Sequence, residues 1–259
     1  MILTVKDVHK NFGVFSALNG VSLNVNEDLI TGLIGPNGSG KTTLFNVISG
    51  FYRKDKGSIK FRGEEISGLD PNEIAQKGLV RSFQIPKIPD KMTVLENMLL
   101  ASKTLVGERV LDTVFKVKAI KRTEYSALKK AFSLLELTGL KELSNEYATN
   151  LSGGQKKLLS LGRILMSDPD LILLDEPTAG VNPTLSKELL NVIKTLSKKE
   201  KKSFLIIEHN MAAVSEICDK VIVLASGKKL TEGTPEEVQN DEGVLDAYLS
   251  REDSESSEP

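Results

Sequence analysis

The 259-residue sequence lacks features that mark several classes of protein. Its one cysteine, Cys218, leaves no partner for a disulfide within the chain, and its N-terminus has no charged and apolar leader. We therefore expect an intracellular, reducing environment. The 34 basic and 35 acidic residues give a formal net charge of −1. Because no overall positive field would attract a polyanion, we expect no nucleic-acid partner.

Long apolar runs are also missing. The longest are Leu171–Leu174, Phe204–Ile207 and Val221–Ala225, whereas a membrane-spanning helix needs roughly 20 apolar residues. The sequence thus predicts that this chain does not cross a membrane. If it serves a membrane process, other subunits must supply the pathway.

A phosphate-binding loop is the clearest pattern that is present. Its eight residues follow G-x-x-x-x-G-K-[ST] between an apolar strand at 29–34 and a predicted helix at 41–49 that Gly50 ends. Small residues let backbone N–H groups approach phosphate oxygens, while the lysine reaches the β and γ phosphates and the hydroxyl reaches Mg²⁺. The predicted nucleotide-binding residues are Gly35, Pro36, Asn37, Gly38, Ser39, Gly40, Lys41, Thr42 and Thr43.

The remaining periodicities predict an α/β protein with two additions. Near-alternating apolar residues at 2–5, 21–25 and 58–62 are typical of antiparallel strands and predict a β subdomain. Residues 90–150 have helical spacing, with a capping box that begins at Thr93 and a helix predicted at 123–137.

The second half of the chain resumes the α/β pattern. Continuous apolar strands at 171–174 and 204–207, separated by a helix at 183–196, predict buried parallel strands. A hairpin is predicted at 221–231. The Ser/Glu-rich tail at 251–259 has no large apolar residue, so we expect it to be disordered.

A second anion-binding pattern follows the helical segment. Leu151-Ser152-Gly153-Gly154-Gln155 places a serine at a predicted helix start, where a hydroxyl and N–H groups can bind an anion. This pentapeptide resembles the signature of ATP-binding cassette (ABC) ATPases. Together with the glycine loop, it makes the sequence similar to that family over nearly the whole chain. The resemblance implies a head-to-tail dimer with two ATP molecules in the interface. In that dimer Ser152, Gly153, Gly154 and Gln155 contact the γ-phosphate bound by the partner's loop.

The resemblance also implies a catalytic set. Asp175 would hold Mg²⁺, on a strand beside the glycine loop, and Glu176 would be the general base for the attacking water. His209 matches the switch histidine that contacts the γ-phosphate, although a lone histidine is more often structural. Gln84 matches the glutamine that touches Mg²⁺ and the attacking water. Phe12 matches the aromatic residue that stacks on adenine, although it could also be a core residue.

One departure concerns the loop after Glu176. Many relatives have an aspartate where this chain has Asn182. Asparagine keeps a hydrogen-bonding side chain but carries no charge, so the resemblance implies a weaker interface link there.

The resemblance implies a single ABC ATPase domain at 1–250. Residues 1–89 and 151–250 would form the catalytic core, and 90–150 the helical subdomain, with the signature at 151–155. The chain would power a membrane transporter from the cytoplasmic face of the cell membrane, with a second ATPase subunit and permease subunits as partners and a substrate-binding protein acting indirectly. A soluble ABC ATPase is the alternative, but those usually carry two cassettes or a long coiled-coil insertion. A kinase or GTPase would lack the signature, and no Asn-Lys-x-Asp motif is present.

Three stretches resemble the branched-chain amino-acid uptake branch of this family. They are Arg81-Ser82-Phe83-Gln84 followed by Met92–Asn97, the pair Asn182-Pro183, and Glu232–Pro235 leading to Val244–Leu249. Related cassettes for urea or amide import and for lipopolysaccharide export share parts of this pattern, so those substrates remain alternatives.

Overall fold

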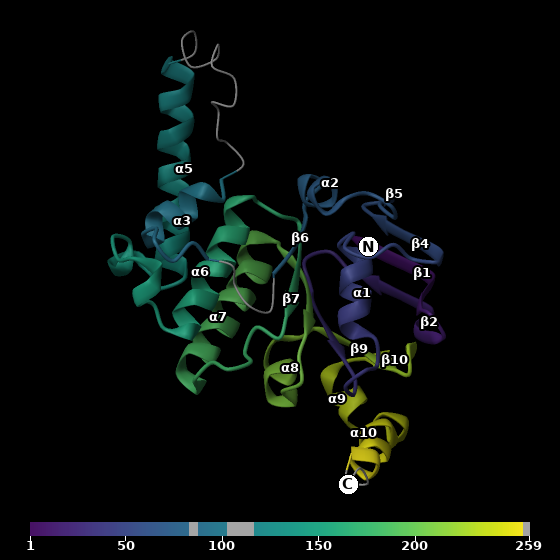
Figure 1. The fold of residues 1–259 in the computed structure, drawn as a ribbon. Coiled ribbons are helices and arrows are strands. Elements are labelled where there is room, and N and C mark those ends of the chain that lie inside the picture. Colours follow the sequence, from purple (N-terminus) through teal and green to yellow (C-terminus); the bar gives the residue numbers. More distant parts are fainter. Residues whose placement is uncertain (83–87, 103–116, 256–259) are drawn as a thin grey trace. The chain divides into compact units, whose positions relative to one another are not determined.

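The computed structural model describes residues 1–82, 88–102 and 117–255, which divide into two compact units (Figure 1). The helical unit is larger than the predicted 90–150 subdomain, because the signature helix and the loop after Pro177 also belong to it. The α/β unit comprises Met1–Arg81, Asp170–Pro177 and Ile193–Pro259, and the helical unit comprises Ser82–Pro169 and Thr178–Val192.

The first sheet of the α/β unit is antiparallel, with strand order β2-β1-β4-β5. Its strands are β1 (Leu3–Phe12), β2 (Phe15–Val25), β4 (Lys56–Phe61) and β5 (Glu64–Glu65). Strand β1 pairs antiparallel with both β2 and β4, which confirms the predicted β subdomain. Only Gly13 and Val14 separate β1 from β2, so Phe12 and Phe15 are cross-strand partners.

The second sheet has the order β10-β9-β3-β8-β7-β6. Its strands are β3 (Ile30–Ile34), β6 (Leu79–Arg81), β7 (Leu171–Asp175), β8 (Ser203–Ile207), β9 (Lys220–Ala225) and β10 (Lys228–Gly233). Strands β7 and β8 are parallel neighbours and β9 and β10 form an antiparallel hairpin, as predicted. Strand β8 lies between β7 and β3, the strand before the glycine loop. Sequence order does not fix strand order within a parallel sheet.

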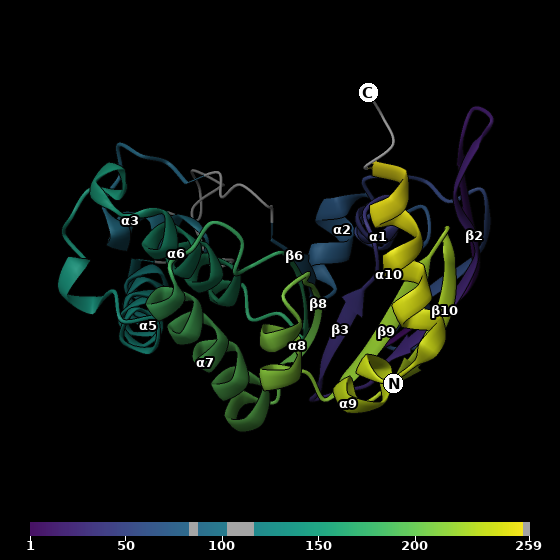
Figure 2. The same cartoon turned by 90° about the horizontal axis from the view of Figure 1, so that it is seen from below.

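Helices cover both faces of the second sheet. Helix α1 (Lys41–Ile48) buries Leu44 and Phe45 in one apolar core that also takes side chains from both sheets and from α2 (Pro71–Gln76). Helices α8 (Met211–Ile217), α9 (Pro235–Gln239) and α10 (Glu242–Glu255) lie on the opposite face. Figure 2 shows α9 and α10 alongside β9 and β10. Burying each such side chain stabilises the fold by roughly 1.5–3 kcal/mol.

The C-terminal tail differs from its prediction. Helix α10 runs to Glu255, so the expected disorder from residue 251 is wrong for 251–255, and 256–259 lie outside the described residues. Low hydrophobicity by itself does not end a helix. No glycine or proline interrupts residues 244–255, and Arg251 and Glu252 are good helix formers.

The helical unit is built from helices and short 3₁₀ turns. They are α3 (Val94–Leu100), α5 (Val117–Leu137), α6 (Gly153–Met166), the short 3₁₀ turns η1 (Lys141–Leu143) and η2 (Ala148–Asn150), and the first half of α7 (Pro183–Glu200). The predicted capping box of Thr93 is confirmed, and Ser152 caps α6 as predicted, with a capping box to Gln155 that the sequence analysis did not predict. Across the described ranges, no helix is long and apolar enough to cross a bilayer.

Candidate functional site

The glycine loop connects β3 to α1 with a backbone that requires glycine. Gly35 has φ 145°, and a Cβ there would lie 2.0 Å from the Leu224 carbonyl oxygen. Gly40 has φ 102°, and a Cβ there would lie 2.6 Å from the Ala17 carbonyl oxygen. Both the left-handed backbone and the close approach exclude a side chain. Because Gly40 offers no side-chain cap, the first-turn amides of α1 can receive a phosphate.

The ammonium group of Lys41 is folded onto its own loop. Its Nζ donates to the carbonyl oxygens of Gly35 at 2.8 Å and Pro36 at 2.9 Å, and lies 3.4 Å from Ser39 Oγ. The side chain is buried. A buried cation needs acceptors, and phosphate oxygens are stronger acceptors than these carbonyls.

Two predicted catalytic residues are in contact. Glu176 follows β7 and His209 follows β8, and their Oε1 and Nε2 atoms lie 3.0 Å apart. The Glu176 N–H donates to the Ile207 carbonyl oxygen at 3.0 Å, which ties the two strand ends together. Glu176 has φ 46°, a left-handed conformation that costs a non-glycine residue roughly 1–2 kcal/mol. Such strain is concentrated at functional sites.

Asp175 is buried and paired with a residue to which the sequence gave no role. Arg81 Nη2 lies 2.9 Å from Asp175 Oδ2, and its Nη1 donates to Asn46 Oδ1 at 2.6 Å. The guanidinium carbon also lies 5.6 Å from the centre of the Phe45 ring. Arg81 ends β6, the strand beside β7. The signal in the sequence was a basic residue, Arg81, at the end of a strand. Its pairing with Asp175 could be inferred only once β6 was known to lie beside β7.

A hollow of about 200 Å³ joins the loop to the strand-end pair. It brings together six predicted site residues of the loop with Glu176 and His209, and it adds Phe15 and Ala17, which the sequence analysis missed. The lining residues are Phe15, Ala17, Asn37, Gly38, Gly40, Lys41, Thr42, Thr43, Glu176 and His209.

Other predicted residues lie outside this lining. Gly35, Pro36, Ser39 and Asp175 are not part of it, and the signature residues belong to the helical unit. Gln84 lies outside the described residues.

The predicted adenine-stacking residue also lies outside the hollow. Phe12 is 45% exposed and packs edge-on against Tyr52, with ring centres 5.4 Å apart, while Lys10 Nζ lies 5.3 Å from its ring centre. Its cross-strand partner Phe15 is 60% exposed and lines the hollow. An aromatic residue on each side of Gly13-Val14 was the signal in the sequence, but only the folded structure shows that Phe15 of β2 lines the hollow.

The two signature glycines have different surroundings. A Cβ on Gly153 would meet nothing within 4 Å, whereas one on Gly154 would lie 2.6 Å from Leu185 Cδ1 and 3.0 Å from Val181 Cγ1. Ser152 Oγ accepts the Gln155 N–H at 3.3 Å, and the Gln155 side chain accepts the Ser152 N–H at 2.9 Å. Packing within the helical unit therefore explains why residue 154 is a glycine, but it gives no reason for the glycine at residue 153.

Asn182 begins a helix. Its Oδ1 accepts the Leu185 N–H at 2.9 Å, and Pro183 follows as the first residue of α7. Asparagine at a helix N-cap and proline directly after it both favour a helix start. The uncharged side chain of Asn182 therefore caps α7 within this chain.

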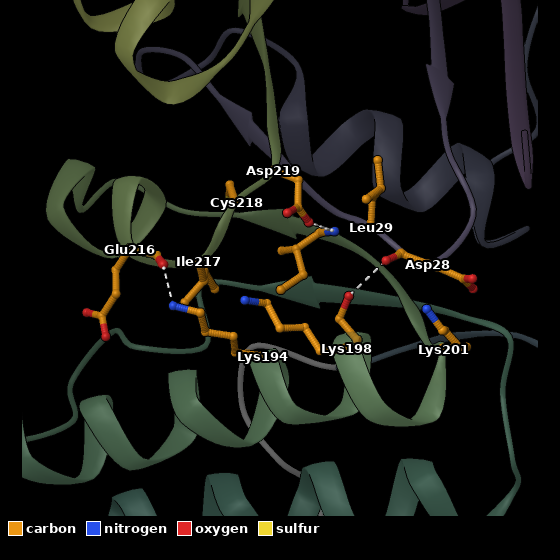
Figure 3. A pocket seen from close by; sticks show the side chains of 11 residues that line it. Asp28, Leu29, Lys194, Lys198, Lys201, Glu216, Ile217, Cys218 and Asp219 are labelled. Carbon is orange, nitrogen blue, oxygen red and sulfur yellow. Dashed lines mark hydrogen bonds between the residues drawn. The ribbon is translucent and has the colours of Figure 1, made fainter.

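A second hollow, of about 400 Å³, lies at the opposite, amino edge of the parallel strands (Figure 3). Lys194, Lys198 and Lys201 are balanced in its lining by Asp28, Glu216 and Asp219, and Lys194 Nζ donates to the Glu216 carbonyl oxygen at 3.3 Å. Equal numbers of opposite charges give no net attraction for an anion. Ligands of open α/β sheets bind at the carboxyl edge, so the smaller hollow is the candidate site.

Comparisons with known proteins agree with this geometry. The family model for the ABC transporter matches residues 18–179, and the model for the branched-chain amino acid ATP-binding cassette transporter matches residues 228–249. The chain is 44% identical to the probable branched-chain amino acid transport ATP-binding protein LivG of Archaeoglobus fulgidus, over 98% of this chain and 97% of the relative. It is 40% identical to the high-affinity branched-chain amino acid transport ATP-binding protein BraF of Pseudomonas aeruginosa, over 96% and 97%.

A solved structure gives the same result. The crystal structure of the ADP conformation of an ATP-binding cassette of an ABC transporter superposes with a TM-score of 0.82 at 38% identity, covering 96% of this chain and 98% of that one. The predicted ABC-type α/β fold is thereby confirmed. The chain belongs to the ABC transporter family, and it is an ATP-hydrolysing, ATP-binding transporter subunit.

Proposed function

We propose that this ATPase powers the import of branched-chain amino acids. The observation that carries the proposal is the match of residues 228–249 to the branched-chain model, a segment beyond the general ABC match. The names of both relatives point to the same substrates.

The proposed catalytic residues meet in the hollow of the α/β unit. Lys41 exchanges the carbonyls of Gly35 and Pro36 for the β and γ phosphates of ATP, while the loop amides bind the same oxygens. Glu176 accepts a proton from the water that attacks the γ-phosphorus, and ADP leaves as the opposite bond breaks. His209, 3.0 Å from the Glu176 carboxylate, orients that carboxylate and the water.

Mg²⁺ fits the oxygen groups around this hollow. Thr42 presents an exposed hydroxyl in the lining. Asp175 is engaged by Arg81, so its carboxylate would reach the ion through a water molecule. In the described ranges no three His, Cys, Asp or Glu side chains converge on a possible metal position. Mg²⁺ commonly takes only one or two protein ligands beside phosphate oxygens and water, where it neutralises developing charge. Gln84 remains a proposed ligand.

The signature is proposed to act on a second ATPase subunit. The hollow of about 200 Å³ is smaller than the roughly 300–1,000 Å³ of common ligand pockets, as expected of half of a shared site. Gly153 has open space above it, so another surface can approach the N-terminus of α6 closely. Ser152 and this helix start would then bind the partner's γ-phosphate. Adenine would stack on an aromatic residue of the β1–β2 hairpin, for which Phe12 is the predicted choice.

Dimer formation can be tested apart from transport. The Glu176→Gln protein should elute as a dimer with ATP and as a monomer without it. Adding Ser152→Arg should restore the monomer while each subunit still binds nucleotide, because Ser152 does not line the hollow. A dimer whose formation is unaffected by ATP and by Ser152→Arg would contradict the proposal of a shared site.

The partners are proposed to be permease subunits, a second ATPase subunit that is either a copy of this chain or a different cassette, and indirectly a substrate-binding protein, with this chain at the cytoplasmic face of the membrane. The test is reconstitution of the complete complex in liposomes. ATP-dependent uptake of leucine, isoleucine and valine is expected, and a complex with Lys41→Ala is the control that should take up none. Uptake of urea or an amide, or export of lipopolysaccharide, would refute the proposed substrate but would not contradict the ATPase activity.

A further inference from the structure

Strand β1 runs past the end of its neighbour β4. The pairing of β1 with β4 ends at His9 and Lys56, whereas its pairing with β2 continues to Phe12 and Phe15. The tip of the β1–β2 hairpin therefore extends beyond β4. Backbone N–H groups on that side of the tip need an acceptor other than a neighbouring strand.

Asp55, the residue directly before β4, supplies that acceptor. Its own N–H donates to the His9 carbonyl oxygen at 2.8 Å, so its main chain continues the contact of the two strands. Its carboxylate Oδ2 accepts the Asn11 N–H at 2.6 Å and the Asn11 side-chain amide at 3.1 Å. The other carboxylate oxygen lies 3.4 Å from Lys10 Nζ. The Asn11 N–H holds the pKa of the Asp55 carboxyl below its ordinary value, so at neutral pH this group is an ionised acceptor.

A second contact from the same segment reaches the hairpin. The Phe12 ring packs edge-on against Tyr52, and the Tyr52 N–H donates to the carbonyl oxygen of Asn46, in α1, at 3.0 Å. The segment that leaves the end of α1 thus holds the hairpin at Phe12 and at Asn11. The start of the same helix lines the hollow through Lys41.

We propose that Asp55 is a positioning residue that holds the aromatic residues of the β1–β2 hairpin where the base of ATP stacks. Phe15 of this hairpin lines the hollow, whereas Asp55 does not. Asp55 therefore acts on the nucleotide through the hairpin, and it sets the affinity for the base without touching it. The inference rests on the proposed stacking of adenine on this hairpin.

The test compares a nucleotide with a ligand that has no base. Asp55→Ala removes the acceptor of the Asn11 N–H, and losing the net contribution of such hydrogen bonds predicts a roughly 2- to 10-fold rise in the Kd of ADP. The Kd of inorganic triphosphate should keep its wild-type value, because the glycine loop is unchanged. The KM for ATP should rise with the Kd of ADP, and kcat at saturating ATP should stay within about twofold.

Two further variants separate the hydrogen bonds from charge and from general loosening. Asp55→Asn keeps an oxygen that can accept the Asn11 N–H and removes only the charge, so it should recover most of the wild-type affinity for ADP. Glu64→Ala on β5 is the matched control, because it removes an exposed carboxylate of the same sheet that is paired with Lys77 at 2.6 Å. It should change neither Kd.

Amide hydrogen exchange without nucleotide is the second measurement. Peptides that span residues 9–16 should exchange faster in Asp55→Ala than in the wild type, while peptides of β7 and β8 should not change. A wild-type Kd of ADP in Asp55→Ala would overturn the proposal, as would an equal rise in the Kd of inorganic triphosphate. If Phe12→Ala and Phe15→Ala both bound ADP like the wild type, the stacking role of the hairpin would fail instead, so the two failures are distinguishable.

Discussion

Glu176 and His209 are 33 residues apart in the chain, yet their Oε1 and Nε2 atoms lie 3.0 Å apart. The contact exists because β7 and β8 are parallel neighbours that end at the same edge of the sheet. A carboxylate held by an imidazole in the hollow beside the glycine loop has the geometry of a general base with its orienting partner.

Replacing the proposed general base, Glu176, should separate the chemical step from ATP binding. Glu176→Gln should lower kcat for ATP hydrolysis on the order of 10²- to 10⁴-fold, because the amide cannot accept the proton of the attacking water. The Kd of ATP should stay near the wild-type value. Single-turnover hydrolysis and nucleotide titration measure the two quantities, and turnover at the wild-type rate would rule out this role. Lys41→Ala is the complementary variant, in which ATP binding itself should weaken.

The two hairpin phenylalanines can be distinguished by nucleotide binding. If Phe15 contacts adenine, Phe15→Ala should weaken ADP binding by about 1–3 kcal/mol, roughly 5- to 150-fold, as for loss of a base–aromatic stack. Phe12→Ala should then have the smaller effect, because Phe12 packs against Tyr52. Isothermal titration of each variant decides between them. The reverse order would support the adenine role predicted for Phe12 from the sequence.

The signature glycines predict opposite results from the same substitution. Gly154→Ala should lower the melting temperature, because its methyl group would overlap Leu185 and Val181, and overpacking costs about 1–3 kcal/mol. Gly153→Ala should leave the melting temperature unchanged, since nothing lies within 4 Å.

For ATP-dependent dimerisation and hydrolysis we expect Gly153→Ala to be the more harmful of the two substitutions. ATP-dependent dimerisation and hydrolysis should fall in Gly153→Ala, because the added methyl group faces the proposed partner surface. Thermal unfolding and light scattering on the same samples provide the comparison. A Gly153→Ala protein with full activity would count against close approach at this position.

Breaking the buried ion pair should be costly. Arg81→Met leaves the Asp175 carboxylate without its cation at a place where the two side chains are 9% and 5% exposed, so we expect unfolding to become easier by about 3–5 kcal/mol. The control is Lys77→Met, which removes the 39% and 69% exposed pair with Glu64 and should leave stability nearly unchanged, because solvent screens such a pair. Urea unfolding measures both, and equal losses would contradict the assigned burial.

The thiol of Cys218 should be unreactive in the folded protein. Burial, with smaller contributions from Asp219 and Glu208, raises the pKa of this thiol from 9.0 to about 12. At pH 8 very little reactive thiolate is present, so iodoacetamide should modify the protein only after denaturation. Rapid modification of the native protein would contradict this.

The same shift predicts how stability depends on pH. Between about pH 9 and pH 12 the unfolded thiol loses its proton while the folded thiol keeps it. The unfolded state then binds fewer protons, so the contribution of Cys218 to stability falls as the pH rises through this window and is constant below it. A Cys218→Ala protein, compared by urea unfolding at pH 8 and pH 10, should lack this part of the decline.

The sequence by itself determined the local features of this protein. The glycine loop, the capping box of Thr93, the helix cap of Ser152 and the apolar runs of β7 and β8 depend on neighbouring residues, because turn geometry, helix capping and strand burial are short-range effects. The resemblance of two short motifs then identified the family, and through it the residues worth examining.

Only the tertiary structure decided which strands and side chains are neighbours. Strand order is set by the packing of helices on both faces of a sheet, so the sequence could not place β8 between β3 and β7 or pair Arg81 with Asp175. The folding of β2 onto the glycine loop brought Phe15 rather than Phe12 to the hollow. Docking of α10 packed Tyr248 against the cluster that contains Ile34, more than two hundred residues earlier in the chain. Each of these relationships joins distant segments, and the packed core that joins them exists only in the folded chain.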